Sequence, residues 1–404
     1  MTDLERILSL WREIESASAD CVLATVIAVQ GPSYRKPGAL MLLTADGRRA
    51  GAISGGCLEA EVASRAWWLT AHGSTIQQYS TADDDGDRPF GSGCGGVVFL
   101  LLERRVTAAP LLVALQQAFD QRSALSVATV LEGSRLGRRA FAGLEQDVLE
   151  RLRAMDSRLE SHDALLGPRE ALSDALQALA ERSLASREPA EASIADADKT
   201  VRAWADYRVP RPTLGIFGAG DDARPLQSLA KELGWYVTVA DGRSHLASRE
   251  RFMHADELYT LPINDLPGDL SGLALREALP VFASLHREDA AVVMTHSFEQ
   301  DAKIIACLLR LEAPPFYIGV LGPQRRTREL LVEAARLLNV PEGAIPAQAD
   351  HWLDQVYAPT GLDLGAESPE AIALSILAEI QKTRSAATAL PLRQVRTSAV
   401  TAGG

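Results

Sequence analysis

Two of the chain's four cysteines lie inside glycine-rich loops, where a thiol could do chemistry. Cys57 follows Ser-Gly-Gly at the start of an expected helix, whose dipole favours a thiolate. Cys94 lies in Gly-Ser-Gly-Cys-Gly-Gly, just before an expected strand. This pattern predicts either two thiols that face one anionic ligand or soft metal centre, or two small apolar residues in tight turns. Cys21 begins an expected strand and Cys307 lies on an expected helix, so both are predicted to belong to the core.

A further glycine-rich turn joins an expected strand to an expected helix. Gly218 and Gly220 match the first two glycines of the dinucleotide fingerprint, with alanine in the third place. Asp241 ends the next strand, where an acid would bind a ribose. Asp221 and Asp222 begin the helix, where their carboxylates can cap its N–H groups and repel a phosphate. The turn predicts a Rossmann-type fold and leaves nucleotide binding open.

Other polar candidates follow later strands of the same half. His296 ends an expected buried strand, so it could contact a ligand, act as an acid or base, or serve only the structure. Gly322, Arg325 and Arg326 open a helix and could hold an anion or be solvated. The remaining histidines show no ligand spacing, so no metal held by protein side chains is predicted.

These residues need elements to position them, and the first third predicts a mixed α/β domain. Apolar spacing predicts helices over residues 1–20 and 58–71, and β-branched runs predict strands over 22–29, 39–44, 49–53, 75–79 and 97–102. A proline- and glycine-rich loop with Arg35 and Lys36 follows the first strand. Farther along, 125–131 predicts a strand, 143–183 helices and 184–199 a solvated linker.

The second half alternates strands and helices. Strands are expected over 213–217, 236–240, 258–261, 290–295 and 316–321, with helices over 222–233, 299–311 and 326–338. This alternation predicts a doubly wound parallel sheet. The expected division is an N-terminal α/β domain (1–106), a variable, mostly helical middle region with linker (107–205), a Rossmann-like domain (206–384) and a flexible tail (385–404).

Composition excludes several classes of protein. The 404 residues include 41 Lys plus Arg and 53 Asp plus Glu, for a net charge of −12. So acidic a chain disfavours nucleic acid and anionic membrane surfaces as partners. No C-x-x-C pair supports a zinc finger or disulfide scaffold. The acidic start and short apolar runs predict neither a signal peptide nor a membrane span, and hence a cytoplasmic protein.

The motifs together resemble those of the XdhC/CoxI family, the accessory factors of xanthine dehydrogenase and related molybdenum hydroxylases. In the first half they are GPSYRKPGA at 31–39, GAISGGCLE at 51–59 and GSGCGG at 91–96. In the second half they are IFGAGDDARPL at 216–226, LAKELGWYVTVAD at 229–241, VVMTHSFEQD at 292–301, YIGVLGP at 317–323 and GLDLGAESPEAIALSI at 361–376. The resemblance covers residues 1–105 and 205–380 and is weak between them.

The resemblance implies a maturation factor without turnover of its own. Such a protein binds molybdenum cofactor, protects it while its terminal sulfido ligand is installed, and helps insert it into an apo-hydroxylase of the xanthine dehydrogenase or CO dehydrogenase type. It also implies an N-terminal XdhC/CoxI domain, a C-terminal Rossmann domain, a cysteine desulfurase as partner and a homodimer.

An anionic, sulfur-rich cofactor needs N–H donors, cations and a soft ligand. Backbone donors are expected from Gly55, Gly56, Gly93, Gly95 and Gly96. Positive charge is expected from Arg35 and Lys36, with a solvated loop as the alternative. Cys57 or Cys94 would lie near the molybdenum. The other candidate cofactor contacts are Gly218, Gly220, Asp241, His296, Gly322 and Arg325.

Two other functions stay open on the sequence. An NAD(P)-dependent oxidoreductase would use the Rossmann domain, but no Tyr-x-x-x-Lys and no evident His–Asp pair support it. A protein-binding adaptor would bridge a cysteine desulfurase and a hydroxylase, and would not need Cys57 or Cys94.

Overall fold

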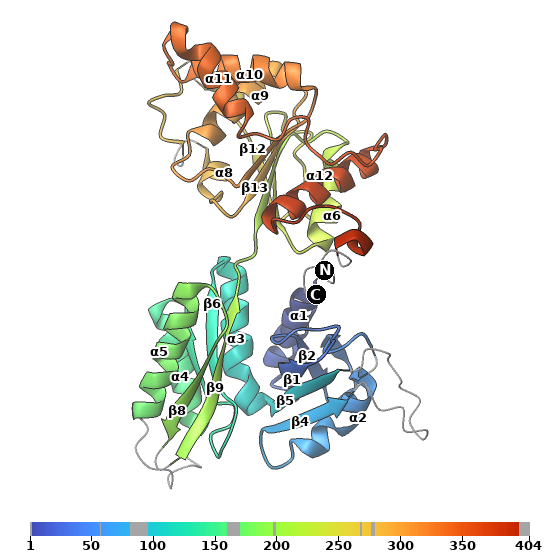
Figure 1. Cartoon of the computed structure of the whole chain (residues 1–404), viewed down its shortest axis with the longest axis vertical. Coiled ribbons are helices and arrows are strands. Elements are labelled where there is room, and N and C mark those ends of the chain that lie inside the picture. The colour runs from blue at the N-terminus through green and yellow to red at the C-terminus, as the bar shows by residue number, and fades with distance from the viewer. Residues whose placement is uncertain are drawn as a thin grey trace, which may run out of the picture. The chain divides into compact units, whose positions relative to one another are not determined.

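The structure is a computed structural model that describes residues 2–56, 58–80, 96–159, 170–196, 199–266, 269–275 and 279–395. The chain divides into two compact units, Met1–Arg211 and Pro212–Gly404, and each is described by itself (Figure 1). None of the helices in the described ranges is long and apolar enough to cross a membrane. The predicted tail, 385–404, is described only up to residue 395.

The first sheet of the first unit has five strands in the order β3-β2-β1-β5-β4, and its neighbouring strands are antiparallel. Its elements are α1 (Asp3–Ala17), β1 (Cys21–Gln30), β2 (Leu40–Thr44), β3 (Arg49–Gly51), α2 (Glu59–Leu69), β4 (Thr75–Ser80) and β5 (Val97–Arg104). The helices and strands predicted for this third are confirmed, with ends that differ by a few residues.

The central strand β1 is buried on both faces, which explains its nearly unbroken apolar sequence. Val22 and Ala24 pack in one cluster with residues of α2. Cys21 and Leu23, on the opposite face, pack in another cluster with residues of α1 and α3. The sheet is therefore covered on both faces at β1, and the loops that leave it carry the candidate site.

A second sheet of four antiparallel strands, in the order β7-β6-β9-β8, follows in the same unit. Its elements are α3 (Arg105–Gln121), β6 (Leu125–Val130), β7 (Arg139–Ala142), α4 (Gln146–Leu159), α5 (Glu170–Ser186), β8 (Ala190–Asp196) and β9 (Lys199–Arg208). Helix α5 packs against this sheet through Leu172, Leu176 and Leu179 (Figure 1). Helix α3 joins the two sheets, because its residues share one apolar cluster with residues of β1 and β6.

The prediction of a solvated linker over residues 184–199 is wrong. Strand β8 pairs with β9 in this stretch, from Ala190 opposite Ala205 to Asp196 opposite Lys199. Because β8 is an edge strand, it needs few apolar anchors, and Ile194 is its one fully buried described residue. Small and acidic residues on such a strand resemble a linker in composition.

The second unit contains a five-stranded parallel sheet in the order β12-β11-β10-β13-β14, which confirms the doubly wound Rossmann-type fold. Its strands are β10 (Thr213–Phe217), β11 (Tyr236–Asp241), β12 (Glu257–Thr260), β13 (Ala290–Val293) and β14 (Tyr317–Val320). Its helices are α6 (Ala223–Glu232), η2 (Ile263–Asp265), α8 (Pro280–Ala283), α9 (Phe298–Leu309), α10 (Gln324–Leu337), η3 (Glu342–Ala344), α11 (Ile345–Leu353) and α12 (Pro369–Arg384).

The order of strands reverses at β10, because the chain runs outward through β11 and β12 and then continues through β13 and β14 on the other side. Helices α6 and α12 lie side by side and pack on one face of the sheet (Figure 1). Helices α9 and α10 contribute to the apolar cluster on the other face. The carboxyl ends of β10 and β13 therefore meet at a switch point, where open α/β sheets bind ligands.

Candidate functional site

A groove of about 410 Å³ lies in the first unit where the loop after β1 meets the loop between β3 and α2. Three arginines, Arg6, Arg35 and Arg49, line it together with Asp3. The Asp3 carboxylate accepts one hydrogen bond from Arg6 and one from Arg35, each at 2.6 Å. Arg49 is exposed and forms no ion pair within the described ranges. The groove thus has local positive charge in an acidic chain.

The predicted residues Arg35, Gly55 and Gly56 come together at this groove. A side chain at Gly55 would contact the ring of Tyr34 at 3.5 Å, and Tyr34 itself is 72% exposed. The guanidinium of Arg35 lies 5.7 Å from the centre of the same ring. Nε of Arg35 is buried and has no hydrogen-bond partner in the described structure. Tyr34 was not predicted as a site residue, although it stands beside Arg35 in the sequence.

The turn at Gly55 and Gly56 is held by a buried carboxylate that the sequence patterns did not reveal. Oε1 of Glu59 accepts hydrogen bonds from the backbone N–H groups of Ile53 at 3.1 Å and Ser54 at 2.8 Å. The Ser54 hydroxyl donates to Oε2 of Glu59 and accepts from the N–H of Gly56. Gly56 has a φ of 111°, which favours glycine. In the sequence, the sign of this hydrogen-bonded turn is a glutamate five residues after a serine.

The same hydrogen bonds set the charge of Glu59. Burial raises the pKa of this carboxyl, but hydrogen bonds from Ser54 and the neighbouring backbone lower it, and the pKa lies below its usual value. The Glu59 carboxylate therefore already accepts hydrogen bonds from groups of its own chain. It fixes the turn at Gly55 and Gly56 through bonds to Ile53 and Ser54.

The other predicted residues of the first unit divide into two groups. Lys36 is exposed and does not line the groove. Cys57, Gly93, Cys94 and Gly95 lie outside the described residues. The residue after them, Gly96, is described, and a side chain there would clash with the Pro32 carbonyl at 2.1 Å. The second cysteine loop therefore ends against the loop that carries Arg35.

The two remaining cysteines are core residues, as predicted. Cys21 and Cys307 are both buried. Burial raises the pKa of each thiol to about 12, which keeps both protonated at neutral pH. Across the described ranges, histidine, cysteine, aspartate and glutamate form no group of three or more that could hold a metal ion.

In the second unit, Gly218 forms a turn that no other residue fits. Its φ is 125°, and a side chain there would lie 2.4 Å from the Met294 carbonyl oxygen. Its N–H donates to the carbonyl of Ala240 at 2.8 Å. The turn after β10 is thereby placed against the ends of β11 and β13. Gly220 lies nearby, where a side chain would be 3.9 Å from the His296 ring.

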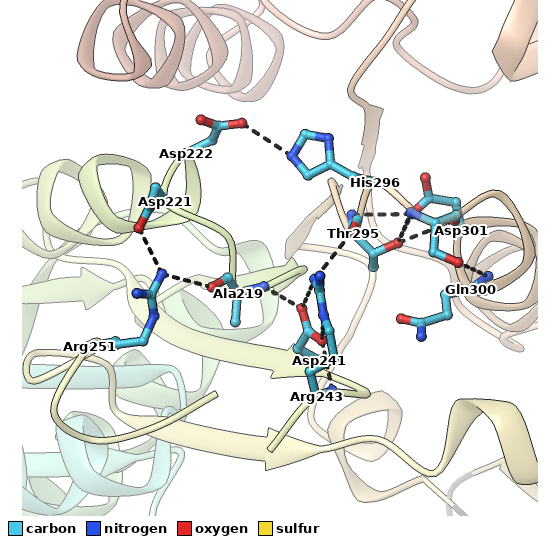
Figure 2. Close-up of polar contacts among 11 residues, drawn as sticks. Ala219, Asp221, Asp222, Asp241, Arg243, Arg251, Thr295, His296, Gln300 and Asp301 are labelled. Carbon is cyan, nitrogen blue, oxygen red and sulfur yellow. Dashed lines mark hydrogen bonds and ion pairs between the residues drawn. The ribbon is translucent and has the colours of Figure 1, made fainter. Parts of the chain in front are cut away.

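The carboxylate of Asp241 forms hydrogen bonds within the protein. The side chain is fully buried, and one carboxylate oxygen accepts from the N–H of Ala219 at 2.7 Å. The guanidinium of Arg243 donates to both oxygens, at 2.9 and 2.8 Å (Figure 2). Burial raises the pKa of Asp241, but the bonds from Arg243 and Ala219 lower it below its usual value. A ribose would find neither oxygen exposed, and Arg243 was missed as the partner.

The two aspartates at the start of α6 do not cap it, contrary to expectation. Asp222 is the N-cap residue but makes no side-chain cap bond. Its carboxylate lies 3.2 Å from Nε2 of His296, and Asp221 pairs with Arg251 at 2.9 Å (Figure 2). The His–Asp pair that the sequence did not reveal is therefore present. His296 is 59% exposed and has a φ of 64°.

The arginines after β14 also differ in their placement. Arg326 donates to Asp301 at 2.7 Å. The buried Asp301 also accepts from the hydroxyl and N–H of Thr295 (Figure 2). Arg325 is 91% exposed on its side chain and pairs with Glu329 on α10. Gly322 has a φ of 119° at the turn before α10. Arg326 thus belongs to the network at the strand ends, whereas Arg325 is a solvated helix residue.

Comparison with known proteins matches both units. The model of the family described as "XdhC and CoxI family" matches residues 15–80, and the "XdhC Rossmann domain" matches residues 214–380. The chain is 31% identical over 376 residues to a probable xanthine dehydrogenase subunit of Bacillus subtilis (strain 168), across 90% of this chain and 93% of that protein.

Two further likenesses are informative. "Molybdenum cofactor insertion chaperone PaoD" of Escherichia coli (strain K12) is 32% identical over 132 residues, which are 30% of this chain and 38% of that protein. The crystal structure of a xanthine dehydrogenase from Bacillus halodurans superposes with a TM-score of 0.64 and 26% identity, over 97% of this chain and 98% of that chain. The likeness to this solved structure therefore extends through the middle region as well as both matched domains.

Proposed function

This chain belongs to the XdhC and CoxI family, and from that premise we propose that it binds molybdenum cofactor in the groove of its first unit. In this proposal it protects the cofactor while a cysteine desulfurase supplies the terminal sulfido ligand. It then helps to insert the cofactor into an apo molybdenum hydroxylase of the xanthine dehydrogenase type. The likeness to a named molybdenum cofactor insertion chaperone supports the choice of cofactor. We further propose a homodimer that has no turnover of its own.

The observation that carries the proposal is the pairing of Arg35 with the Gly55–Gly56 turn across one groove. The cofactor is an anionic pterin that bears a phosphate. Guanidinium groups match phosphate oxygens in geometry and charge, and Nε of Arg35 lacks a protein partner among the described residues. The exposed ring of Tyr34 offers a flat face to a pterin. The residues present therefore fit the group.

In this proposal the thiol of Cys57 is the soft ligand for the molybdenum centre. Cys57 directly follows Gly56 in the sequence, and α2 begins two residues later at Glu59. A thiol favoured as thiolate by the helix dipole suits a sulfur-rich molybdenum centre, which supplies the oxygen and sulfur chemistry of the hydroxylase. Cys94 is the second proposed thiol, because Gly96 ends its loop beside Pro32.

The second candidate function is an NAD(P)-binding oxidoreductase, which the His296–Asp222 pair favours. Asp241 speaks against it, because its oxygens are buried and bonded to Ala219 and Arg243. Calorimetry with NAD⁺ and NADP⁺ distinguishes the two functions. We expect no saturable binding below about 1 mM, the upper end of the substrate affinities on which enzymes usually work. Micromolar binding with turnover of a small carbonyl compound would favour the oxidoreductase.

The main proposal is tested on protein purified without oxygen from molybdenum-replete cells. We expect pterin and molybdenum at about one per chain, as simple one-site binding requires. Deletion of the gene is expected to leave the client hydroxylase without active cofactor. A freshly isolated chain without pterin, together with normal hydroxylase maturation in the deletion strain, would contradict the proposal.

A further inference from the structure

The middle region contains a second cavity, of about 660 Å³, that is separate from the groove. Its walls come from the start of α3, the loop between β6 and β7, and the facing parts of α4 and α5. The turn before β4 closes it through Gly73 and Ser74. Cavities that bind small organic molecules have volumes of roughly 300–1,000 Å³. The space therefore suits a ligand of the size of a nucleotide.

The charged lining of this cavity is mainly basic. Four arginines line it, Arg135, Arg138, Arg139 and Arg153, against one acidic residue, Asp174, among the described residues. Arg135 pairs with Asp196 at 2.6 Å. Arg153 is exposed and forms no ion pair with any described residue. In a chain with a net charge of −12, so many guanidinium groups in one cavity favour an anion.

Arg139 gives an independent sign of a missing acceptor. Its side chain is only 4% exposed, and its Nη atoms bond to the Glu103 carboxylate and to the carbonyls of Thr107 and Gly137. Its Nε is buried and has no partner within the described structure. Buried N–H groups are rarely left without an acceptor. Arg139 lines this cavity, so a ligand oxygen that reached its Nε would satisfy it.

The rest of the lining is apolar. Val106 and Pro110 of α3, Leu149 and Leu152 of α4, and Phe141 of β7 contribute to the wall. Val106, in the first turn of α3, is 62% exposed, so its side chain is open to a ligand. Apolar walls together with guanidinium planes suit an aromatic body that carries an anionic group at one end.

We infer that this cavity binds a phosphorylated heteroaromatic compound, with Arg153 and Arg139 toward the phosphate and the walls of α3 and α4 toward the ring. The inference goes beyond the proposed function, because it names a second binding site whose lining, apart from Gly73 and Ser74, lies outside the residues that the two family models match. Two sources share this chemistry, a nucleotide and a pterin phosphate. The experiment separates them.

Titration calorimetry on the full chain with guanosine monophosphate, guanosine and a pterin monophosphate tests the inference. We expect at least one phosphate compound to bind, and guanosine to bind about tenfold or more weakly than its monophosphate if the nucleotide is the ligand. Arg153→Gln should weaken phosphate binding about tenfold. Arg151→Gln is the matched control, because Arg151 lies on the same helix, is exposed and does not line the cavity.

A second variant tests the apolar wall. Val106→Trp adds volume at an exposed position, so it should fill the cavity and reduce binding of the phosphate compound without unfolding the chain. Binding of the pterin compound alone identifies a pterin source if Arg153→Gln weakens it and Arg49→Gln in the groove does not. Binding of the nucleotide alone identifies a nucleotide source. No binding of either phosphate, or equal losses in Arg151→Gln and Arg153→Gln, would overturn the inference. Cofactor retention in the groove is a separate measurement and would be unaffected.

Discussion

Glu103 on β5 and Arg139 on β7 form a buried, two-pronged ion pair that joins the two sheets of the first unit. The side chain of Glu103 is 0% exposed and that of Arg139 is 4% exposed. Burial raises the pKa of Glu103, and the Arg139 guanidinium opposes this effect. Gly137 has a φ of 87°, and a side chain there would lie 2.7 Å from the Glu103 carboxylate. The pair therefore ties the middle region to the first sheet at a closely packed point.

Breaking this pair from one side should destabilise the first unit strongly. Glu103→Gln leaves a buried guanidinium without its counter-charge, and we expect a loss of about 3–5 kcal/mol in the free energy of unfolding. The double variant Glu103→Gln with Arg139→Gln should lose less than the sum of the two single variants. Urea unfolding measures all three. Glu132→Gln, which breaks an exposed pair with Arg202, should change stability little, and additive losses at Glu103 and Arg139 would contradict the coupling.

The sequence predicted most elements of the fold because their patterns are local. Buried strands such as β1 and β10 are continuous apolar runs, and the turn at Gly218 requires glycine for steric reasons visible in the motif. Strand β8 was missed because an edge strand buries little and its composition is that of a linker. β8 is recognisable as a strand only through its pairing with β9, the next strand in the chain. Most of the buried apolar residues of this pair belong to β9.

The candidate site was predicted less completely because its contacts are distant in sequence. His296 and Asp222 are far apart in the chain and meet only when β10 and β13 are neighbours. Arg243 was missed because an arginine two residues after a strand has no local signature of its use. Glu59 was nearer, but a carboxylate that bonds backward to Ser54 is recognised only when the turn between them is known.

Removing charge from the groove should weaken cofactor binding. Arg49 lines the groove, is exposed and has no ion pair within the described part of the chain, so Arg49→Gln should leave the fold unchanged. We expect the dissociation constant for molybdenum cofactor to rise about tenfold, the size of one charged hydrogen bond. Arg48→Gln is the control, because it removes the same charge from the preceding residue. Arg48 does not line the groove and pairs with Glu13 and Asp46. Equal effects of the two changes would show that only net charge matters.

The two classes of cysteine should behave differently. Cys57→Ala is expected to lower cofactor retention, because it removes the proposed soft ligand beside Gly56. Cys307→Ala should leave retention unchanged, since Cys307 is buried in the second unit and its pKa of about 12 keeps the thiol protonated. Pterin and molybdenum are measured in protein purified without oxygen. Equal retention in both variants would show that the thiol of Cys57 plays no special part.

Acid should destabilise the second unit through Asp241. The pKa of Asp241 in the folded chain lies below the unfolded value of about 3.9, so its stabilising effect is present above that pH and is lost as pH falls. Asp241→Asn should lower the free energy of unfolding at pH 7 by about 2–3 kcal/mol. The free energy should then fall less steeply than in the wild type between about pH 5 and 3.

Urea unfolding over a series of pH values checks this expectation. Asp363→Asn is the control, because Asp363 is exposed and makes no hydrogen bond with the described residues. Its slope with pH should match that of the wild type. An unchanged slope in Asp241→Asn would mean that the bonds from Ala219 and Arg243 do not hold the carboxylate charged.

The backbone at His296 should store strain that glycine relieves. With a φ of 64°, a residue that has a Cβ atom costs about 1–2 kcal/mol more than glycine. His296→Gly and His296→Ala both remove the contact with Asp222, so their difference isolates the backbone. We expect the glycine variant to be the more stable by about 1 kcal/mol in urea unfolding.

At Glu299, in the first turn of α9, the same pair of substitutions should show the opposite order, because a helix favours alanine. Equal stability of the His296→Ala and His296→Gly variants would show that the backbone at this position stores no strain. If the alanine variant equals the wild type in stability, the imidazole does not serve the fold, which supports a role for His296 toward a ligand at the strand ends.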